Sequence, residues 1–269
     1  MQYQMNIFVR FITTFVILFF IQSTYSQNDI QSADIPDPAR FTQEIQQFIN
    51  WDNKNTFPTD AMLFVGSSSI RLWETNRFFH DYPVINRGFG GSHISDVNYF
   101  FDSVVRKYHP QAIIFYAGDN DIAAGKEIAQ VVKDYKDFIN MVEEKCSGTP
   151  VVFIAIKPSL ARWNFWPRMQ ETNQKITEFS LQKTNLHVLD ISMVMLDQCG
   201  EPDPSLFIED GLHITESGYE LWTSLLKDKL SHIIPIVKVE MDKAPEQRKC
   251  EDYEDNTERI RFAFSGDRV

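Results

Sequence analysis

Short, nearly continuous apolar runs alternate along the chain with longer stretches in which apolar residues recur every three or four positions. The short runs predict strands buried on both faces, as in a parallel sheet. Five such runs stand at residues 61–65, 83–86, 111–117, 151–156 and 186–189. Strands that alternate with helices favour a sheet covered on both faces, with right-handed crossovers. The pattern therefore predicts an α/β fold, a three-layer α/β/α sandwich around a five-stranded parallel sheet.

The longer stretches carry apolar stripes at helical spacing, which predict amphipathic helices. The first stripe consists of Phe41, Ile45, Phe48, Ile49 and Trp51. Further single helices are expected over residues 69–79, 94–108, 128–142, 167–182 and 215–230. We expect the aliphatic and aromatic residues of these stripes to fill the core.

The N-terminus is typical of a secretory signal. An apolar run at residues 11–21 follows Arg10, and Thr24-Tyr25-Ser26 offers small residues at the positions that a signal peptidase reads. A membrane anchor is the alternative, but Arg10 leaves the run too short to span a bilayer comfortably. We predict cleavage after Ser26 and a secreted or periplasmic mature protein without a stable membrane span.

The sequence divides into four predicted segments. They are a signal peptide over residues 1–26, an N-terminal arm and first helix over 27–60, the main domain over 61–231 and a C-terminal extension over 232–269. In the extension, two β-like pieces at residues 236–239 and 260–264 flank a charged stretch. An edge hairpin and a loose tail are both open for this extension.

Composition and charge limit the partners. The chain has 269 residues, of which 43% are hydrophobic, so it can bury a sizeable core. A formal net charge of -11 gives no attraction to nucleic acid or to an anionic membrane, and we expect neither as a partner. Export permits one disulfide among Cys146, Cys199 and Cys250, with the pairing open. No cluster of cysteine and histidine indicates a metal.

Polar residues suited to catalysis follow four of the predicted strands. The turn Gly66-Ser67-Ser68-Ser69 follows the first strand, and a glycine-rich loop at residues 88–92 follows the second. Asn120 follows the third strand, while Asp210 and His213 lie beyond the fifth. Since the carboxyl ends of parallel strands share one edge of the sheet, we expect these residues to converge there.

The residue types fit acyl transfer, which needs a nucleophile, a base, a group that orients the base and donors for an oxyanion. A serine of the turn supplies the hydroxyl, and His213 can take and return a proton near neutral pH. Asp210 stands three residues before His213, within reach of its Nδ1–H. The backbone N–H groups of Ser68 and Gly91, with the Asn120 amide, can point at one oxygen. Each feature alone is at least as typical of an ordinary turn; their combination is the signal.

Four blocks of the sequence resemble the SGNH (GDSL-like) hydrolases, in the same order. Gly66-Ser67-Ser68 is similar to the Gly-Asp-Ser block, and Asn86-Arg87-Gly88-Phe89-Gly90-Gly91 to the second block. Gly118-Asp119-Asn120-Asp121 matches Gly-x-Asn-Asp, and Asp210-Gly211-Leu212-His213 matches Asp-x-x-His. The resemblance covers residues 61–230 and assigns the nucleophile to Ser68 rather than to Ser67 or Ser69.

The resemblance also implies what each of the other positions does. Asp210 and His213 complete a catalytic triad with Ser68, and Ser68, Gly91 and Asn120 form the oxyanion hole. It further implies a flavodoxin-like fold with strand order 2-1-3-4-5 and ester hydrolysis without metal or cofactor.

Two positions depart from the family pattern. Ser67 replaces the aspartate of the first block, and Ser92 stands where many members carry aspartate. Neither is an assigned catalytic position, and both are expected to change local hydrogen bonding and substrate preference. The Gly-x-Ser-x-Gly elbow of α/β-hydrolases is absent, because Ile70 occupies the place of its second glycine.

Residues of a substrate pocket are suggested by position alone. His93 adjoins the Gly91 loop and is the one further histidine that we place at the cleft. Trp163, Phe165 and Trp166 follow the fourth strand on the same edge of the sheet. There they either wall an acyl or sugar pocket or simply pack.

These predictions together favour a secreted serine esterase that hydrolyses carboxylic esters. Aromatic residues near the cleft, which can stack on sugar rings, favour acetyl or short-chain acyl esters of carbohydrates, so the partner is a small-molecule or glycan ester. The alternatives are a lysophospholipase or other lipid esterase, an acyltransferase to a sugar hydroxyl, and an inactive carbohydrate-binding relative.

Overall fold

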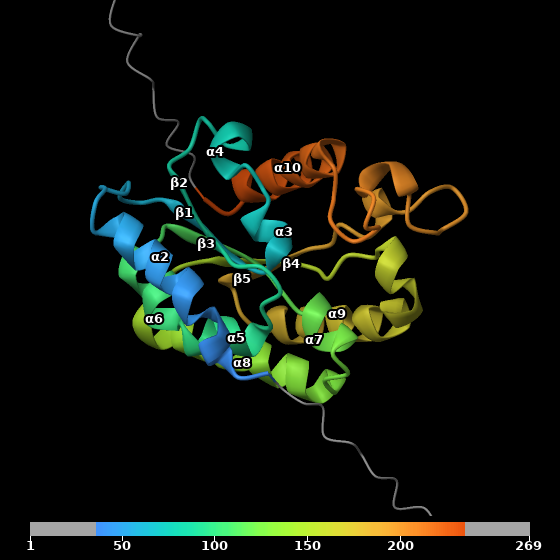
Figure 1. Ribbon diagram of the computed structural model, residues 1–269, viewed down its shortest axis with the longest axis horizontal. Helices are drawn as coiled ribbons and strands as arrows, with labels where there is room; N and C mark the ends of the chain where they lie inside the picture. The colour runs from blue at the N-terminus through green and yellow to red at the C-terminus, as the bar shows by residue number, and fades with distance from the viewer. Residues whose placement is uncertain (1–35, 235–269) are drawn as a thin grey trace, which may run out of the picture.

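Five strands form one parallel sheet in the computed structural model, which describes residues 36–234 (Figure 1). The strand order is β2-β1-β3-β4-β5. The strands are β1 (Met62–Gly66), β2 (Val84–Gly88), β3 (Ala112–Tyr116), β4 (Val151–Ile154) and β5 (Leu186–Leu189). The predicted α/β fold, the five strands and their order are therefore confirmed.

The register of the sheet brings the ends of three strands to one level. Gly66 at the end of β1 pairs with Gly88 at the end of β2 and with Tyr116 at the end of β3. The loops that carry Ser68, Gly91 and Asn120 therefore leave the sheet side by side. This edge of the sheet is where the candidate chemistry lies.

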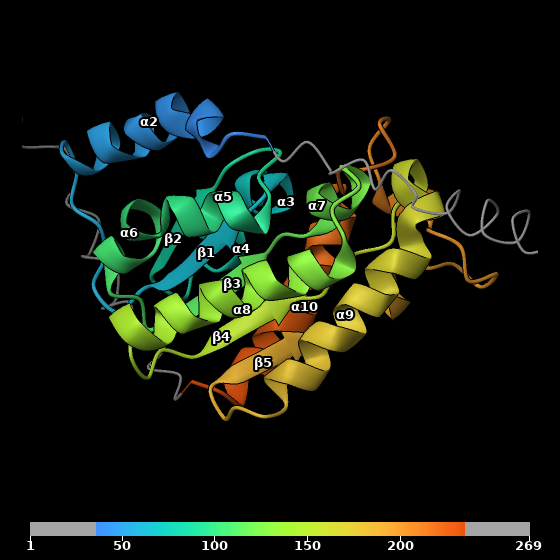
Figure 2. The same ribbon diagram turned by 90° about the horizontal axis from the view of Figure 1, so that it is seen from below.

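Helices cover both faces of the sheet (Figures 1 and 2). One layer consists of α2 (Thr42–Asp52), α5 (Ile94–Tyr99), α6 (Phe101–Val104), α8 (Ile128–Lys145) and α9 (Trp166–Ser180), and the opposite layer of α3 (Ser68–Arg71), α4 (Thr75–Phe78) and α10 (Glu216–Ser231). Each layer has its own buried apolar cluster against the sheet. A short helix, α7 (Asp119–Ala123), follows β3 directly.

The prediction of one continuous helix over residues 69–79 is wrong, because the chain forms α3 and α4 with a break between them. Asn86 on β2 stabilises this break. Its side-chain Nδ2 donates to the carbonyl oxygens of Ile70, at 2.7 Å, and Trp73, at 3.1 Å. Trp73 is buried at the break, so the apolar pattern is satisfied without a continuous helix.

The helix expected over residues 94–108 is likewise divided, into α5, α6 and a 3₁₀ turn at Arg106–Tyr108. Val105 leaves helical geometry with φ -126° and ψ -69°, yet its side chain stays buried. On α2, Trp51 is 67% exposed and does not share the buried stripe that its spacing predicted. Apolar spacing thus located the buried faces better than the helix ends.

Several predictions concern residues outside 36–234. The signal peptide, most of the arm, the two β-like pieces of the extension and Cys250 lie there. Cys146 and Cys199 form no disulfide within the described part of the chain. Between residues 36 and 234, none of the helices has the length and hydropathy needed to cross a membrane.

Gly66 provides a test of how tightly β1 and β3 meet. It has φ +135°, and a Cβ there would lie 1.9 Å from the Tyr116 carbonyl oxygen. Gly148 also has a positive φ, of +83°, but a Cβ there meets nothing within 4 Å. We expect Gly148→Ala to lower the free energy of unfolding by about 1–2 kcal/mol and Gly66→Ala by at least about 3 kcal/mol. Urea unfolding of both variants measures the difference, and equal losses would contradict the close approach.

Candidate active site

The turn after β1 places Ser68 at the start of α3. Gly66 brings the chain against β3, where the Ser67 N–H donates to the Tyr116 carbonyl oxygen at 2.9 Å. On the other side, the Phe89 N–H donates to the Gly66 carbonyl oxygen at 2.9 Å. Ser67 and Ser69 are buried, whereas Ser68 is half-buried. Of the three hydroxyl side chains, only that of Ser68 is therefore presented at the edge of the sheet.

Asp210 and His213 come from the turn that precedes α10. The Ile208 N–H donates to the His213 carbonyl oxygen at 2.9 Å, which closes this turn. Asp210 Oδ1 accepts the backbone N–H groups of Leu212 and His213, at 2.8 and 2.9 Å. Its Oδ2 lies 2.6 Å from His213 Nδ1. One carboxylate oxygen holds the turn, and the other orients the imidazole ring.

His213 connects this turn with Ser68, although the two lie 145 residues apart in sequence. The Nε2 atom of the ring is 3.0 Å from Ser68 Oγ. Since Nδ1 donates to Asp210, Nε2 is the acceptor and the Ser68 hydroxyl is the donor. The structure therefore brings the three predicted triad residues into one hydrogen-bonded chain.

The charge of Asp210 is maintained by this geometry. Partial burial raises the pKa of its carboxyl, but hydrogen bonds from the His213 ring and from the Leu212 and His213 backbone outweigh this and hold the pKa at about 2. The carboxylate is thus negatively charged at any pH near neutrality. It stabilises a positive charge on the imidazole ring.

Gly91 leads the chain away from β2 and has φ +77°. It is exposed, and a Cβ there would meet nothing within 4 Å, so the space above its backbone is open. Within residues 36–234, the backbone N–H groups of Ser68 and Gly91 have no hydrogen-bond acceptor. Both are therefore available to an incoming oxygen.

Asn120 lies in the first turn of α7, directly after β3. Its Nδ2 donates to the Ser92 carbonyl oxygen at 3.1 Å, which ties α7 to the Gly91 loop. Its Oδ1 accepts Arg162 Nη2 at 2.8 Å. A guanidinium only donates and a carbonyl only accepts, so the orientation of the amide is determined. One of the two Nδ2 hydrogens is bound to Ser92, which leaves the second for a ligand.

Asp121, the last residue of the same block, has a structural position. It is fully buried, its Oδ1 lies 2.6 Å from Lys126 Nζ, and its Oδ2 accepts the Ile94 N–H at 3.2 Å. Lys126 also reaches Asp134 on α8 at 2.8 Å. These contacts join α5, α7 and α8 beneath the Gly91 loop.

The two serines that depart from the family pattern are both buried. Among the described residues, the hydroxyls of Ser67 and Ser92 have no hydrogen-bond partner. A carboxylate at either position would therefore be desolvated without a donor from the surrounding side chains.

The expected pocket residues have different positions. His93 is 5% exposed and lies at the N-terminus of α5, where its N–H donates to Asp96 Oδ2 at 2.7 Å. Trp166 is 7% exposed, belongs to the apolar cluster of the α8/α9 layer and stacks with Trp163. Trp163 and Phe165 are half-buried. Of the aromatic residues, these two are better placed than Trp166 to meet a ligand.

A hollow of about 220 Å³ adjoins the histidine turn. Its apolar side chains come from two separate segments on the same face of the sheet: Leu72 follows α3, while Ile208 and Ile214 flank the histidine turn. Charged residues also line it, namely Glu74, Arg77 and Glu216. Sequence patterns missed this hollow because its walls come from segments far apart in the chain.

Two further cations close to Asn120 were also missed from the sequence. Arg162 lies on the 3₁₀ segment Leu160–Phe165, and Lys157 lies just after β4. Lys157 is fully buried, with Nζ 3.2 Å from the Tyr116 hydroxyl and 3.6 Å from Asp119 Oδ2. The sequence did offer one signal for Lys157 and Arg162: both follow the predicted fourth strand, and the other site residues also follow predicted strands.

Comparisons with known proteins identify the family of the chain. Residues 71–221, more than half of the chain, match the GDSL-like Lipase/Acylhydrolase family. The chain therefore belongs to that family, and it is a serine hydrolase that acts on ester bonds. No curated protein matches the sequence.

Solved structures of similar fold include a GDSL-like lipase from Bacteroides thetaiotaomicron, with a TM-score of 0.62 and 16% identity over 71% of this chain and 98% of that one. A carbohydrate esterase of family 3 from Talaromyces cellulolyticus has a TM-score of 0.51 and 16% identity over 64% and 97%. An acetyl xylan esterase has a TM-score of 0.52 and 16% identity over 63% and 99%. At these identities the likeness concerns the fold.

Burial of His93 predicts a loss of stability in acid. Burial, with the charges of Lys126 and Arg40, lowers the pKa of His93 to about 4, although Asp96 and Asp119 oppose this. An unfolded histidine has a pKa of about 6.5. Between these values the unfolded chain binds a proton that the folded chain does not, so stability falls as pH falls from 6.5 to 4, by about 3 kcal/mol.

The test compares His93→Asn with His80→Asn, because the His80 side chain is 65% exposed. We expect His93→Asn to flatten the decrease in the free energy of unfolding between pH 6.5 and 4, and His80→Asn to leave it as in the parent. Denaturant unfolding at pH 7, 5.5 and 4.5 measures both slopes. An unchanged slope in His93→Asn would contradict a buried, neutral His93.

Proposed function

We propose that the chain is a secreted serine esterase that cleaves carboxylic esters with Ser68, His213 and Asp210. The observation that supports this most directly is the hydrogen-bonded chain through His213, with 3.0 Å to Ser68 Oγ and 2.6 Å to Asp210 Oδ2. Export rests on the signal sequence predicted over residues 1–26. The arrangement has the geometry of a nucleophile whose proton is taken by an oriented base.

In the first half of the reaction, Ser68 Oγ attacks the ester carbonyl carbon while its proton passes to His213 Nε2. The imidazole becomes positively charged, and the carboxylate of Asp210 stabilises that charge. Collapse of the tetrahedral intermediate breaks the bond to the alcohol, which leaves with the proton from His213. An acyl group then remains on Ser68.

In the second half, water takes the place of the alcohol. His213 removes a proton from the water, the hydroxide attacks the acyl carbon, and the proton returns to Ser68 Oγ as the acid leaves. His213 thus acts as base and then as acid in each half.

The negative oxygen of each intermediate is bound by three donors. They are the backbone N–H groups of Ser68 and Gly91 and the free Nδ2 hydrogen of Asn120. The open backbone at Gly91 supports this role, since the substrate oxygen must approach the main chain closely.

Short acyl esters of carbohydrates are the substrate class that we propose. Half-buried Trp163 and Phe165 lie on the segment that also carries Arg162, whose guanidinium contacts Asn120, and the part of each ring that stays exposed supports contact with a sugar. Two proteins of similar fold are named a carbohydrate esterase and an acetyl xylan esterase, which supports the same class. A panel of acetylated glycans and nitrophenyl esters of increasing chain length tests it; preference for long acyl chains or lysophospholipids would overturn the substrate but keep the mechanism.

Ser68→Ala is expected to abolish hydrolysis of p-nitrophenyl acetate and labelling by a fluorophosphonate, because the nucleophilic oxygen is removed. Ser67→Ala is the matched control, since its hydroxyl is buried and one position away. Both variants and the parent are incubated with the probe and separated by electrophoresis. Full activity of a purified Ser68→Ala protein, or absent labelling of the parent, would overturn the proposed mechanism.

Asn120→Ala is expected to lower kcat by roughly 10²–10³, the usual loss for one oxyanion donor. Asn164→Ala serves as the control, because Asn164 is exposed on the neighbouring 3₁₀ segment. Steady-state hydrolysis of p-nitrophenyl acetate gives kcat and KM for each. A kcat within about twofold of the parent would remove Asn120 from this role.

A further inference from the structure

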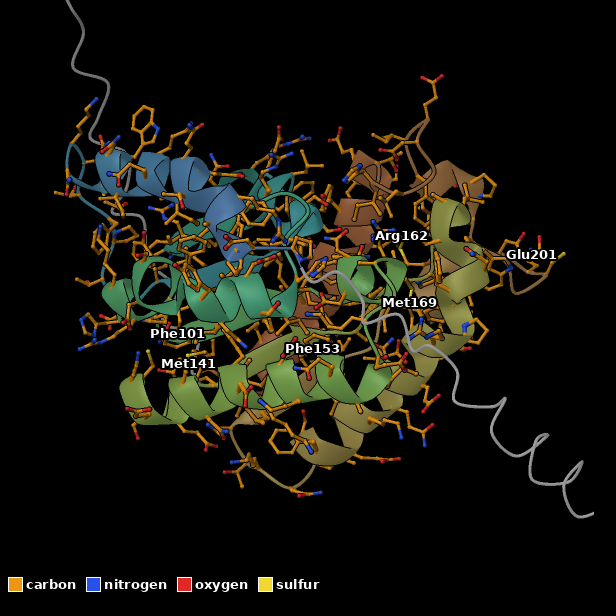
Figure 3. The ribbon with its side chains drawn as sticks, turned by 60° about the horizontal axis from the view of Figure 1, so that its bottom comes forward. Phe101, Met141, Phe153, Arg162, Met169 and Glu201 are labelled. Carbon is orange, nitrogen blue, oxygen red and sulfur yellow. The ribbon has the colours of Figure 1, made fainter. Side chains whose placement is uncertain are left out.

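Arg162 makes two contacts that end at the candidate oxyanion hole. Its Nη1 lies 2.9 Å from Asp119 Oδ2, and its Nη2 lies 2.8 Å from Asn120 Oδ1. Asp119 and Asn120 are consecutive residues at the start of α7. Figure 3 shows Arg162 where its segment, α7 and the C-terminal part of the chain come together. One guanidinium therefore holds both the Asp119 carboxylate and the Asn120 amide side chain.

The guanidinium is shielded from water. The Arg162 side chain is 17% exposed, and that of Asp119 is 4% exposed. The same Asp119 Oδ2 lies 3.6 Å from the Nζ of buried Lys157, which also contacts the Tyr116 hydroxyl. A charge in such surroundings acts over short distances with little screening. The two arginine contacts are thus fixed in position and electrostatically effective.

The segment that carries Arg162 also contacts the histidine turn. The Ala161 N–H donates to the Gly211 carbonyl oxygen at 3.0 Å, and a Cβ on Gly211 would lie 3.1 Å from Leu160 Cβ. Gly211 directly follows Asp210. Residues 160–162 therefore lie between the triad side of the site and its oxyanion side.

From these contacts we propose that Arg162 is a positioning residue for the oxyanion hole, a role that rests on the proposed function. Arg162 takes no part in making or breaking bonds. It locks the carbonyl end of the Asn120 amide, so that the free Nδ2 hydrogen points at the developing negative oxygen. Its charge on Oδ1 also polarises the amide and strengthens that N–H as a donor.

The proposal predicts a coupled loss of rate. Arg162→Met removes both contacts while retaining the length of the stem, and kcat for p-nitrophenyl acetate is expected to fall about tenfold with KM within about twofold. In an Asn120→Ala background the same change is expected to cost less than about twofold, because the amide that it positions is gone. Arg162→Lys keeps one charge but cannot reach both partners, and is expected to retain part of the rate.

Arg168→Met is the matched control. Arg168 is part-buried on α9, and its Nη2 donates to the Lys126 carbonyl oxygen, away from Asn120. Its kcat is expected to equal that of the parent. Thermal unfolding of every variant shows whether a lower rate follows from lost structure. If Arg162→Met yields no folded protein, Arg162→Lys in the parent and Asn120→Ala backgrounds provides the same comparison.

The outcomes separate this proposal from the function on which it rests. Activity in Ser68→Ala overturns the proposed function, whatever Arg162 does. If Ser68→Ala and Asn120→Ala lose activity while Arg162→Met keeps kcat within twofold, only the role of Arg162 is overturned. An equal tenfold loss with and without Asn120 would also overturn it, since the effect would then be structural.

Discussion

The contact between the end of β1 and β3 is the constraint on which the site depends. Gly66 leaves no room for a side chain against Tyr116, and the Ser67 N–H donates to the Tyr116 carbonyl oxygen. Because β3 continues directly into α7, this contact sets the spacing between Ser68 and Asn120. The Phe89 N–H donates to the Gly66 carbonyl oxygen, so the position of the loop after β2 is also fixed relative to Gly66. Parallel strands keep a nearly constant separation, and the sheet therefore determines where the backbone donors lie.

The two sides of the site are built differently. The proposed oxyanion side consists of backbone and amide groups held by the sheet, by buried Asp121 and by Arg162. The proposed triad side depends on one turn before α10, which is partly exposed; the Asp210 side chain is 43% accessible. Residues 160–162 contact both sides, which makes this segment the physical connection between them.

The sequence predicts the strands better than the helix ends or the contacts within the site. Continuous apolar runs located all five strands, because central parallel strands are apolar whatever their loops do; their order followed from the family resemblance. Helix ends were less predictable, since the break after α3 depends on Asn86 of a neighbouring strand. The motifs brought Ser68 near His213, but no local pattern contains the contact between Arg162 and Asn120, which are 42 residues apart. Trp166 faces the core because the phase of α9 decides its direction.

Asp210 and His213 share one short turn, and this has a consequence for how the molecule fails. Their hydrogen bond is nearly local, so the pair stays assembled when other parts of the protein fluctuate. The turn is joined to the body by α10 and by the Ala161–Gly211 hydrogen bond, and release of both would carry Asp210 and His213 away from Ser68 together. Local opening of this region therefore separates the proposed base and its carboxylate from Ser68 in a single event.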